Sequence, residues 1–321
     1  MMFSYFSLFA AVFLVGCRNE SPTKQAPVPQ AQTVSSTVPD FDGRRAYGFL
    51  VAQTNFGPRN PGSAGHRNCL NYLQSELQSA AEAVNTQSFT VSGYQKETLK
   101  LTNVIASFNV KATTRILLLS HWDTRPRADN ESDPKKRDQM ILGANDGASG
   151  VAVLLEIAHN LKLKAPGVGV DILLVDGEDY GKEGDTQYYL LGAKYFAKHL
   201  PPGFVPAFGI LLDMIGDKQL EIPKDRYSVE FAPDIVDLVW STANELRISQ
   251  FSGNLARGWT TDDHLPLNEA GIKTIDLIDF EYPDASNRYW HSVQDTPDKC
   301  SAESLEAVGT VLMHVIYNYK P

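Results

Sequence analysis

Short apolar runs recur along this chain, separated by stretches in which apolar residues follow helical spacing. Four runs have the length and the branched side chains of buried strands: residues 115–121, 169–176, 207–216 and 273–280. Because each run is apolar at consecutive positions, both faces of each strand must be covered. We therefore expect these strands to lie in the middle of a layered fold.

The stretches between the runs predict helices. Apolar side chains repeat at helical spacing in residues 148–161, 232–246 and 301–317. Ser301, followed by Glu303 and Ser304, suits the start of the last helix, because such side chains can hold free backbone N–H groups. The alternation predicts an α/β fold with a doubly wound, mostly parallel central sheet and helices on both faces.

Residues 1–40 depart from this pattern. Residues 6–15 form an apolar run that is short for a transmembrane helix, and Gly16 and Cys17 follow it. The letters LVGC at residues 14–17 resemble the lipobox of bacterial lipoproteins. This resemblance implies that a lipoprotein signal peptide of residues 1–16 is removed and that Cys17 carries lipid. No lysine or arginine precedes the apolar run, so an ordinary signal peptide is the alternative.

The segment after the cysteine, residues 18–40, is rich in proline, serine, threonine and glutamine and has almost no large apolar side chains. It cannot bury enough surface to offset the entropy lost on ordering, so we expect a disordered tether over residues 17–40. A single domain is expected over residues 41–321. The chain as a whole is predicted to be exported and membrane-anchored, in the periplasm or at the cell surface.

Composition and charge narrow the classes of function. The chain has 321 residues, of which 43% are hydrophobic and 21% are charged, and this is enough to bury a sizeable core. A formal charge of −9 argues against nucleic-acid binding, which needs a basic surface. It is compatible with substrates that carry a positive group, such as the N-terminal amine of a peptide. Cys69 and Cys300 could pair in an exported protein, but their sequence positions leave this open.

Polar side chains follow the predicted strands at the points where the strands end. The run at 169–176 leads into DGEDYG, with three carboxylates in four residues. Histidine or aspartate also lies at or near the ends of the runs at 115–121 and 207–216. Carboxyl ends of parallel strands meet at one edge of a sheet, so these side chains should lie together. The candidates are His121, Asp123, Asp146, Asp176, Glu178, Asp179, Asp213 and His291. A lone Asp after a strand is more often a turn or capping residue, and Asp123 and Asp176 could be no more than that.

So many carboxylates at one edge would repel each other unless a cation neutralised them, which predicts a metal site. Carboxylates and imidazoles without thiolate favour zinc in a catalytic site with one open coordination position. Glu178 and Asp179 are adjacent and must point in different directions. One can bind metal while the other transfers a proton, as in metal-assisted attack on a carbonyl.

The motifs around these residues carry a family resemblance that spans most of residues 41–321. In chain order they are SHWDT, GANDGASGVAVLLEIA, DGEDYG, LLDMIGD, TTDDHLPL and YWHSVQDTPD. Their order and spacing resemble the M28 family of zinc peptidases, which implies a zinc exopeptidase-like fold. Within that family the chain is most similar to bacterial glutaminyl cyclases, which convert N-terminal glutamine into pyroglutamate and release ammonia.

The resemblance implies roles for particular residues and one bound Zn²⁺. The implied zinc ligands are Asp146, Asp179 and His291, and the implied proton-transferring carboxylate is Glu178. Asp213 and Asp262 align with acids that form a hydrogen-bonded network beside the glutamate, and Trp290 aligns with a pocket tryptophan. Trp122 is a further candidate for substrate contact, with packing as its alternative. Two departures are noted: Asp179 stands where animal cyclases have glutamate, and Asp276 where they have histidine.

Two other functions remain open. A two-zinc aminopeptidase of the same family would use His121 and Asp213 in addition to the three ligands above. Aminopeptidases usually have Ser-Asp-His where this chain has Asp262, Asp263 and His264, and this difference, with the Trp290–His291 pair, favours the cyclase. In a zinc-free binding lipoprotein we would expect other residue types at one or more of the metal-ligand positions, and here every such position has a residue that can bind metal. The expected partners are peptide or protein N-termini, preferably with glutamine, and the chain is expected to be monomeric.

Overall fold

The computed structural model describes Met1 and residues 38–182 and 184–320. The predicted signal peptide, Cys17 and nearly all of the predicted tether lie outside the described residues. Residues 38–320 belong to one compact unit. In the part of the chain that is described, none of the helices combines the length and the apolar character that crossing a bilayer requires.

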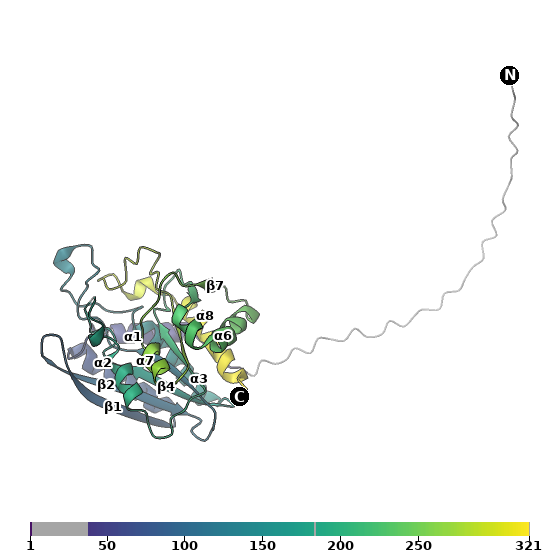
Figure 1. The fold of residues 1–321 in the computed structure, drawn as a ribbon, viewed down its shortest axis with the longest axis horizontal. Coiled ribbons are helices and arrows are strands. Elements are labelled where there is room, and N and C mark those ends of the chain that lie inside the picture. The colour runs from purple at the N-terminus through teal and green to yellow at the C-terminus, as the bar shows by residue number, and fades with distance from the viewer. Residues whose placement is uncertain (2–37, 183, 321) are drawn as a thin grey trace. The chain divides into compact units, whose positions relative to one another are not determined.

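A six-stranded mixed sheet forms the centre of this unit (Figure 1). Its strand order is β1-β2-β4-β3-β5-β8, and β3, β4, β5 and β8 run parallel. The strands are β1 (Ala83–Ser92), β2 (Thr98–Phe108), β3 (Arg115–His121), β4 (Gly169–Val175), β5 (Phe208–Asp213) and β8 (Thr274–Ile278). The four predicted strands are confirmed, and they form the parallel part of the sheet. The antiparallel β1–β2 hairpin was not predicted.

Helices cover both faces of the sheet, as predicted. One face packs against α1 (Gly43–Thr54), α2 (Ala64–Ala80), α3 (Ala148–Leu163), α6 (Pro233–Glu245) and α8 (Ala302–Asn318), and the other against α4 (Leu191–Lys198) and α7 (His264–Glu269). Along β3, Leu118 belongs to the first core and Leu117 and Leu119 to the second. This alternation explains why the parallel strands are apolar at every position.

The three predicted helices are confirmed as α3, α6 and α8, with bounds that shift by no more than two residues. Ser301 is the N-cap of α8, and its Oγ accepts a hydrogen bond from the backbone N–H of Ser304 at 3.1 Å. Arg45 joins α1 to α3, because its Nε and Nη2 donate to the Glu156 carboxylate at 2.5 and 2.6 Å. The two helices are therefore held by charge as well as by apolar packing.

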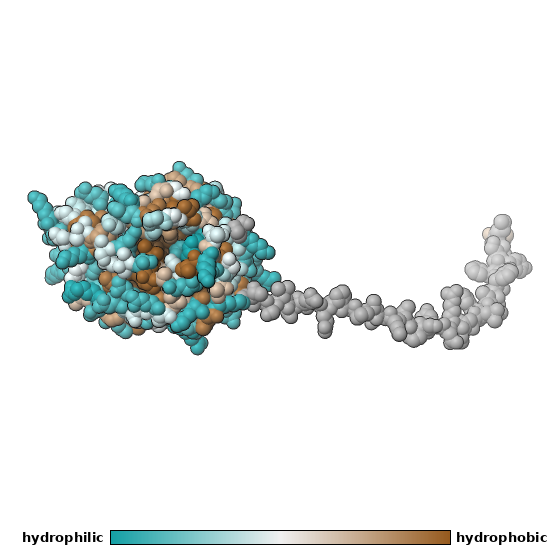
Figure 2. Space-filling model, turned by 90° about the horizontal axis from the view of Figure 1, so that it is seen from below, coloured by the Kyte–Doolittle hydropathy of each residue, from teal (hydrophilic) through white to brown (hydrophobic). Residues whose placement is uncertain are grey.

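The remaining elements lie in the connections. Two short parallel strands form a second sheet, β6 (Ile222–Lys224) and β7 (Phe251–Leu255), and α5 (Arg226–Phe231) follows β6. Three 3-10 helices are η1 (Pro134–Lys136), η2 (Thr186–Tyr188) and η3 (Pro297–Lys299). In the face shown in Figure 2, apolar residues gather in the middle of a largely hydrophilic surface.

The two cysteines of the folded unit are not paired. Cys69 in α2 and Cys300 before α8 are both free and buried. Burial raises the pKa of the Cys69 thiol to about 12. The question that the sequence left open is thus answered against a Cys69–Cys300 disulfide.

Candidate metal and active site

Five buried side chains from five different segments meet at the carboxyl edge of the parallel strands. They are His121 at the end of β3, Asp146 before α3, Asp179 after β4, Asp213 at the end of β5, and His291 between β8 and α8. They form two groups of potential metal ligands that share Asp146. One is Asp146–Asp179–His291 and the other is His121–Asp146–Asp213. The ligands predicted for a one-zinc cyclase and those predicted for a two-zinc aminopeptidase therefore lie together at this edge.

The distances within the two groups suit a shared cation. His291 Nε2 lies 3.2 Å from Asp179 Oδ1 and 3.4 Å from Asp146 Oδ2. His121 Nε2 lies 3.2 Å from an oxygen of Asp146 and 3.2 Å from an oxygen of Asp213. One imidazole nitrogen carries at most one proton, so it cannot serve two carboxylates equally well. A cation placed between these atoms would satisfy all of them.

An unpartnered buried oxygen supports the same conclusion. Asp179 Oδ2 is buried and has no hydrogen-bond partner within the described residues. A buried carboxylate oxygen without a partner is costly unless it binds a cation. The donor set consists of carboxylate oxygens and imidazole nitrogens with no thiolate, so the residues present fit a divalent metal such as zinc.

The electrostatics of the site reflect crowded carboxylates. Burial opposes protonation of His291, but Asp179 and Asp146 raise its pKa above the ordinary value. Burial and the neighbouring Asp179 raise the pKa of Glu178 well above the ordinary value. Negative charge is thus concentrated here, as the sequence predicted, and the site favours any positive group that enters it.

Glu178, Asp213 and Asp262, the predicted catalytic acids, share one electrostatic neighbourhood. Glu178 is only partly buried, whereas Asp213 and Asp262 are 7% and 3% exposed. Burial and the charge of Asp213 raise the pKa of Asp262 well above its ordinary value, and Asp262 in turn contributes to the raised pKa of Glu178. The structure therefore places the three acids where they influence one another, and their individual roles remain predictions.

Two further acids fix the loops that carry the ligands. Asp295 accepts hydrogen bonds from the backbone N–H groups of Asn145 and Asp146 at 2.8 and 3.2 Å, and from the Tyr282 hydroxyl at 2.9 Å. Asp123 accepts from the backbone N–H groups of Glu178 and Asp179 at 3.1 and 3.4 Å. Asp123 belongs to neither potential metal group, in keeping with the turn interpretation of this residue.

Asp176, the other ambiguous acid, also has structural partners. Its carboxylate contacts His66 Nε2 at 2.9 Å and accepts the backbone N–H of Thr102 at 2.7 Å. It belongs to neither potential metal group. These bonds join the end of β4 to β2 and to α2, so Asp176 holds elements together beneath the site.

Arg125 is a component of the site that the sequence interpretation missed. Its Nη1 donates to Asp179 Oδ1 at 2.7 Å, its Nη2 donates to the Tyr189 hydroxyl at 2.9 Å, and it also binds the Asp129 carboxylate. The guanidinium thus binds the same Asp179 oxygen that lies 3.2 Å from His291 Nε2 and fixes the orientation of this carboxylate. Asp295 was missed as well. Arg125 directly follows the motif SHWDT (residues 120–124) and Asp295 lies inside YWHSVQDTPD, but neither lies directly at a strand end.

Local backbone conformation also shapes the site. A Cβ atom at Gly147 would lie 2.5 Å from Cε1 of His121, so only glycine lets the imidazole lie against this turn. His291 has a φ of 51°, in the left-handed region that non-glycine residues rarely adopt. Its carbonyl accepts a hydrogen bond from the backbone N–H of Asn130 at 3.1 Å. Strain of this kind is typical of residues placed for function.

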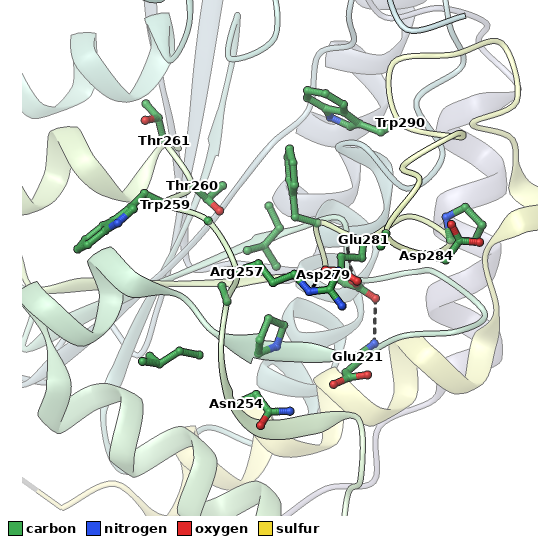
Figure 3. A pocket seen from close by; sticks show the side chains of 18 of the residues that line it. Glu221, Asn254, Arg257, Trp259, Thr260, Thr261, Asp279, Glu281, Asp284 and Trp290 are labelled. Atoms are coloured by element: carbon green, nitrogen blue, oxygen red, sulfur yellow. Dashed lines mark hydrogen bonds and ion pairs between the residues drawn. The ribbon is translucent and has the colours of Figure 1, made fainter. Parts of the chain in front are cut away.

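The two predicted substrate-binding tryptophans have different environments. Trp290 stacks on His291 with ring centroids 3.7 Å apart and lines a cavity of about 700 Å³ next to the site (Figure 3). Trp122 is fully buried, stacks on His66 and donates its indole N–H to the carbonyl of Thr102. The prediction of a substrate contact for Trp122 is therefore wrong, because its side chain is part of the core.

His264 and Asp276 lie deeper, behind the predicted acids. His264 Nε2 is 3.5 Å from Asp225 and its Nδ1 is 3.8 Å from Asp276. Burial lowers the pKa of His264 to about 3, so the ring is neutral. None of the three belongs to a potential metal group among the described residues.

Comparison with known proteins agrees with this geometry. Residues 103–316 match the peptidase family M28. A crystal structure of Bacteroides thetaiotaomicron glutaminyl cyclase bound to N-acetylhistamine is 40% identical, with a TM-score of 0.84, over 88% of this chain and 100% of that one. A leucine aminopeptidase precursor from the same species is also 40% identical, with a TM-score of 0.84, over 88% of this chain and 99% of its own. Among curated relatives, the glutaminyl-peptide cyclotransferase of Bothrops jararaca is 23% identical over 295 residues, which cover 82% of this chain and 77% of that protein.

Proposed function

This chain belongs to peptidase family M28, and from that membership we propose that it is a glutaminyl-peptide cyclotransferase. It converts the N-terminal glutamine of peptides and proteins into pyroglutamate and releases ammonia. The observation that carries the proposal is the grouping of Glu178, Asp213 and buried Asp262 beside the Asp146–Asp179–His291 cluster. The similarity to a bacterial glutaminyl cyclase along nearly the whole folded unit supports it.

We assign one Zn²⁺ to Asp146, Asp179 and His291. When bound there, zinc supplies a Lewis acid that polarises the γ-amide carbonyl of the substrate glutamine. Arg125 and Asp295 support this site, because they fix the Asp179 carboxylate and the backbone of Asp146 respectively. Such supporting contacts tune ligand orientation and metal affinity.

Glu178 has the task of moving protons. The α-amine of a peptide has an ordinary pKa of about 7.7–8.0, so much of it arrives as ammonium and must lose a proton before it can attack. Glu178 accepts that proton in its ionised form, which the charge of His121 favours against the effects of burial and Asp179. Glu178 passes this first proton to solvent. The amine nitrogen then bonds to the γ-carbonyl carbon and gives a second proton to Glu178, which hands it to the amide nitrogen as the bond from that carbon breaks and ammonia leaves.

The other acids and Trp290 orient the substrate. Asp213 and Asp262 hold Glu178 and the amine in place, and Trp290 forms the wall of the pocket next to His291. An N-terminal glutamine is already a single molecule, so the pocket must fold it into the attacking conformation. The enclosed acids also favour the positively charged amine of the incoming substrate.

A two-zinc aminopeptidase is the second candidate, and one specific observation favours it. His121, Asp146 and Asp213 form a second potential metal group, and a leucine aminopeptidase precursor is as similar as the cyclase in identity and TM-score. In that case Asp213 would be a ligand instead of an orienting acid. Asp262, in place of the usual serine, favours the cyclase.

The cellular location of the enzyme is inferred from the sequence alone. We propose that Cys17 carries a lipid anchor and that the enzyme acts as an exported, membrane-attached monomer, in the periplasm or at the cell surface. Cys17→Ser should move the protein from the membrane fraction to the soluble fraction. Unchanged partitioning into detergent would remove the anchor from the account.

Asp262 provides the test that separates the two activities. Asp262→Ser removes a carboxylate beside Glu178, and hydrogen bonds to charged groups contribute about 1.5–3 kcal/mol. Ammonia release from a Gln-starting peptide should therefore fall at least about tenfold with zinc still bound. Asp237→Ser, an exposed aspartate on α6, is the control and should leave the rate unchanged. Release of leucine from a Leu-starting peptide by the wild type without any pyroglutamate from the Gln-starting peptide, together with tolerance of Asp262→Ser, would make the aminopeptidase the better assignment.

A further inference from the structure

We propose that the cavity beyond Trp290 binds the residues that follow the N-terminal glutamine and selects substrates with an apolar and a basic side chain among them. This inference rests on the proposed function, since it concerns the substrates of the same site. Its occupant is the substrate chain itself, which must leave the pocket past Trp290.

The cavity has room for several residues. Its volume is about 700 Å³, within the usual range of about 300–1,000 Å³ for pockets that hold extended small ligands. It is lined by residues from 254–261 at the end of β7, by residues from 278–285 at the end of β8, by Thr186 and Tyr189 after β4, by residues from 219–223 around the start of β6, and by Trp290. Trp290 both lines the cavity and stacks on His291, so this residue connects the cavity with the candidate metal site.

Exposed apolar side chains form part of its wall. Leu255, Trp259 and Phe280 are 50%, 55% and 39% exposed and line the same cavity. Trp259 is held in place, because its ring packs edge-on against Tyr227 at 4.6 Å between centroids. Large apolar groups exposed together in a hollow are typical of binding sites, and a fixed indole offers a flat surface for an apolar or aromatic side chain.

The cavity also carries an excess of negative charge. Glu221, Asp279, Glu281 and Asp284 line it, and among the described residues Arg257 is the one cation that does so (Figure 3). Arg257 is paired with Glu281 at 3.1 Å, and Asp279 accepts the backbone N–H groups of Glu221 and Glu281. The Glu221 carboxylate is exposed and has no ion-pair partner among residues 38–182 and 184–320. A lysine or arginine of the substrate is the partner that this arrangement fits.

The charge preference is tested with matched peptides. A set of Gln-starting peptides carries Lys, Gln or Glu in turn at the second, third and fourth positions, and kcat/KM for ammonia release is measured for each. At one of these positions, kcat/KM for the Lys peptide should exceed that for the Glu peptide by about two- to fivefold, as expected for one partly exposed charge pair. Glu221→Gln should reduce this Lys-to-Glu ratio towards one, whereas Glu230→Gln, at an exposed glutamate on α5 outside the cavity, should preserve it.

The apolar preference is tested on Trp259. In a second peptide set, Leu is compared with Ala at the same positions. Trp259→Ala should reduce the Leu-to-Ala ratio several-fold, and Phe231→Ala, an exposed aromatic outside the cavity, should not. Equal rates for the Lys and Glu series in the wild type, or an equal effect of Glu230→Gln and Glu221→Gln, would overturn the inference. If instead no Gln-starting peptide yields pyroglutamate, the proposed function itself fails.

Discussion

Glu178 and Asp179 are adjacent in the chain yet face different partners. Asp179 contacts Arg125 and His291, and its Oδ2 has no hydrogen-bond partner among the described residues, whereas Glu178 is partly exposed and belongs to neither potential metal group. The backbone N–H groups of both residues are held by Asp123. In the proposed mechanism, this one turn supplies both a metal ligand and a proton carrier.

Exchange of Glu178 for glutamine tests this division of labour. Glu178→Gln keeps the shape of the side chain but cannot accept a proton, so turnover should fall by about two to four orders of magnitude. The zinc content, measured by elemental analysis of the purified protein, should stay at the wild-type level. Asp179→Asn is the matched comparison and should lose metal. Loss of zinc from Glu178→Gln would mean that the two roles are exchanged.

Asp263 predicts a pH effect on stability. Both of its carboxylate oxygens are buried without a hydrogen-bond partner among the described residues, and burial raises its pKa to about 8. The folded state therefore binds a proton more tightly than the unfolded state, and this contribution to stability is lost as the pH rises from about 4 to about 8.

Asp263→Asn should make the free energy of unfolding of the metal-free protein less dependent on pH across this window. The measurement is urea unfolding at several pH values. Asp234→Asn, at an exposed aspartate paired with Lys273, is the control and should keep the wild-type slope. The same slope in Asp263→Asn as in the wild type would contradict the assignment.

At the residue scale, the sequence could predict ligands but not their supports. His121 and Asp146 were recognisable because their chemical types sit at a strand end and in a glycine turn, and His291 was recognisable through the motif around it. The partner of Arg125 lies 54 positions further along the chain, and Asp295 acts on a loop about 150 positions away, so only the folded chain reveals either contact. Trp122 was misjudged because its neighbours in sequence are site residues while its side chain points into the core.

Helices and strands could be predicted where their burial gives the sequence a clear apolar pattern. Strands buried on both faces are apolar at consecutive positions, as in β4, where every residue is buried. The β1 strand is an edge strand in which Phe89 alone is buried, so its sequence is mostly polar and carries little signal. Short helices such as α4 and α7 offer less than three turns of periodicity and were missed for that reason.

The ion pair between α1 and α3 gives a prediction at the scale of elements. Glu156 is fully buried, and Arg45 is 38% exposed. Arg45→Met leaves the buried carboxylate without its cation and should lower the free energy of unfolding by about 3 kcal/mol. Arg44→Met, at the exposed neighbouring position, should change it little.

The double variant Arg45→Met, Glu156→Gln should recover much of this loss, because no charge is then left buried. Denaturant unfolding of the four proteins checks both statements. Equal stability of Arg45→Met and Arg44→Met would show that apolar packing alone holds α1 on α3.

For the whole molecule, the fold places an acidic cavity next to a cluster of potential metal ligands. The parallel strands bring their carboxyl ends to one edge, and the glycine turn at Gly147 lets His121 approach closely. The fold class could be predicted from the sequence because strand and helix patterns alternate along the chain. The number of bound metal ions could not be predicted. The ligands of a one-zinc cyclase and those of a two-zinc aminopeptidase both lie around Asp146.

The central claim is that this cluster drives cyclisation of N-terminal glutamine. The most direct measurement is mass spectrometry of one Gln-starting and one Leu-starting peptide after incubation with the enzyme, before and after removal of metal with a chelator and again after zinc is restored. We predict that the Gln peptide loses one ammonia and keeps all its residues, that the Leu peptide is unchanged, and that activity vanishes with the metal and returns with zinc. Release of the first residue from either peptide without pyroglutamate, or full cyclisation by metal-free protein, would contradict the account.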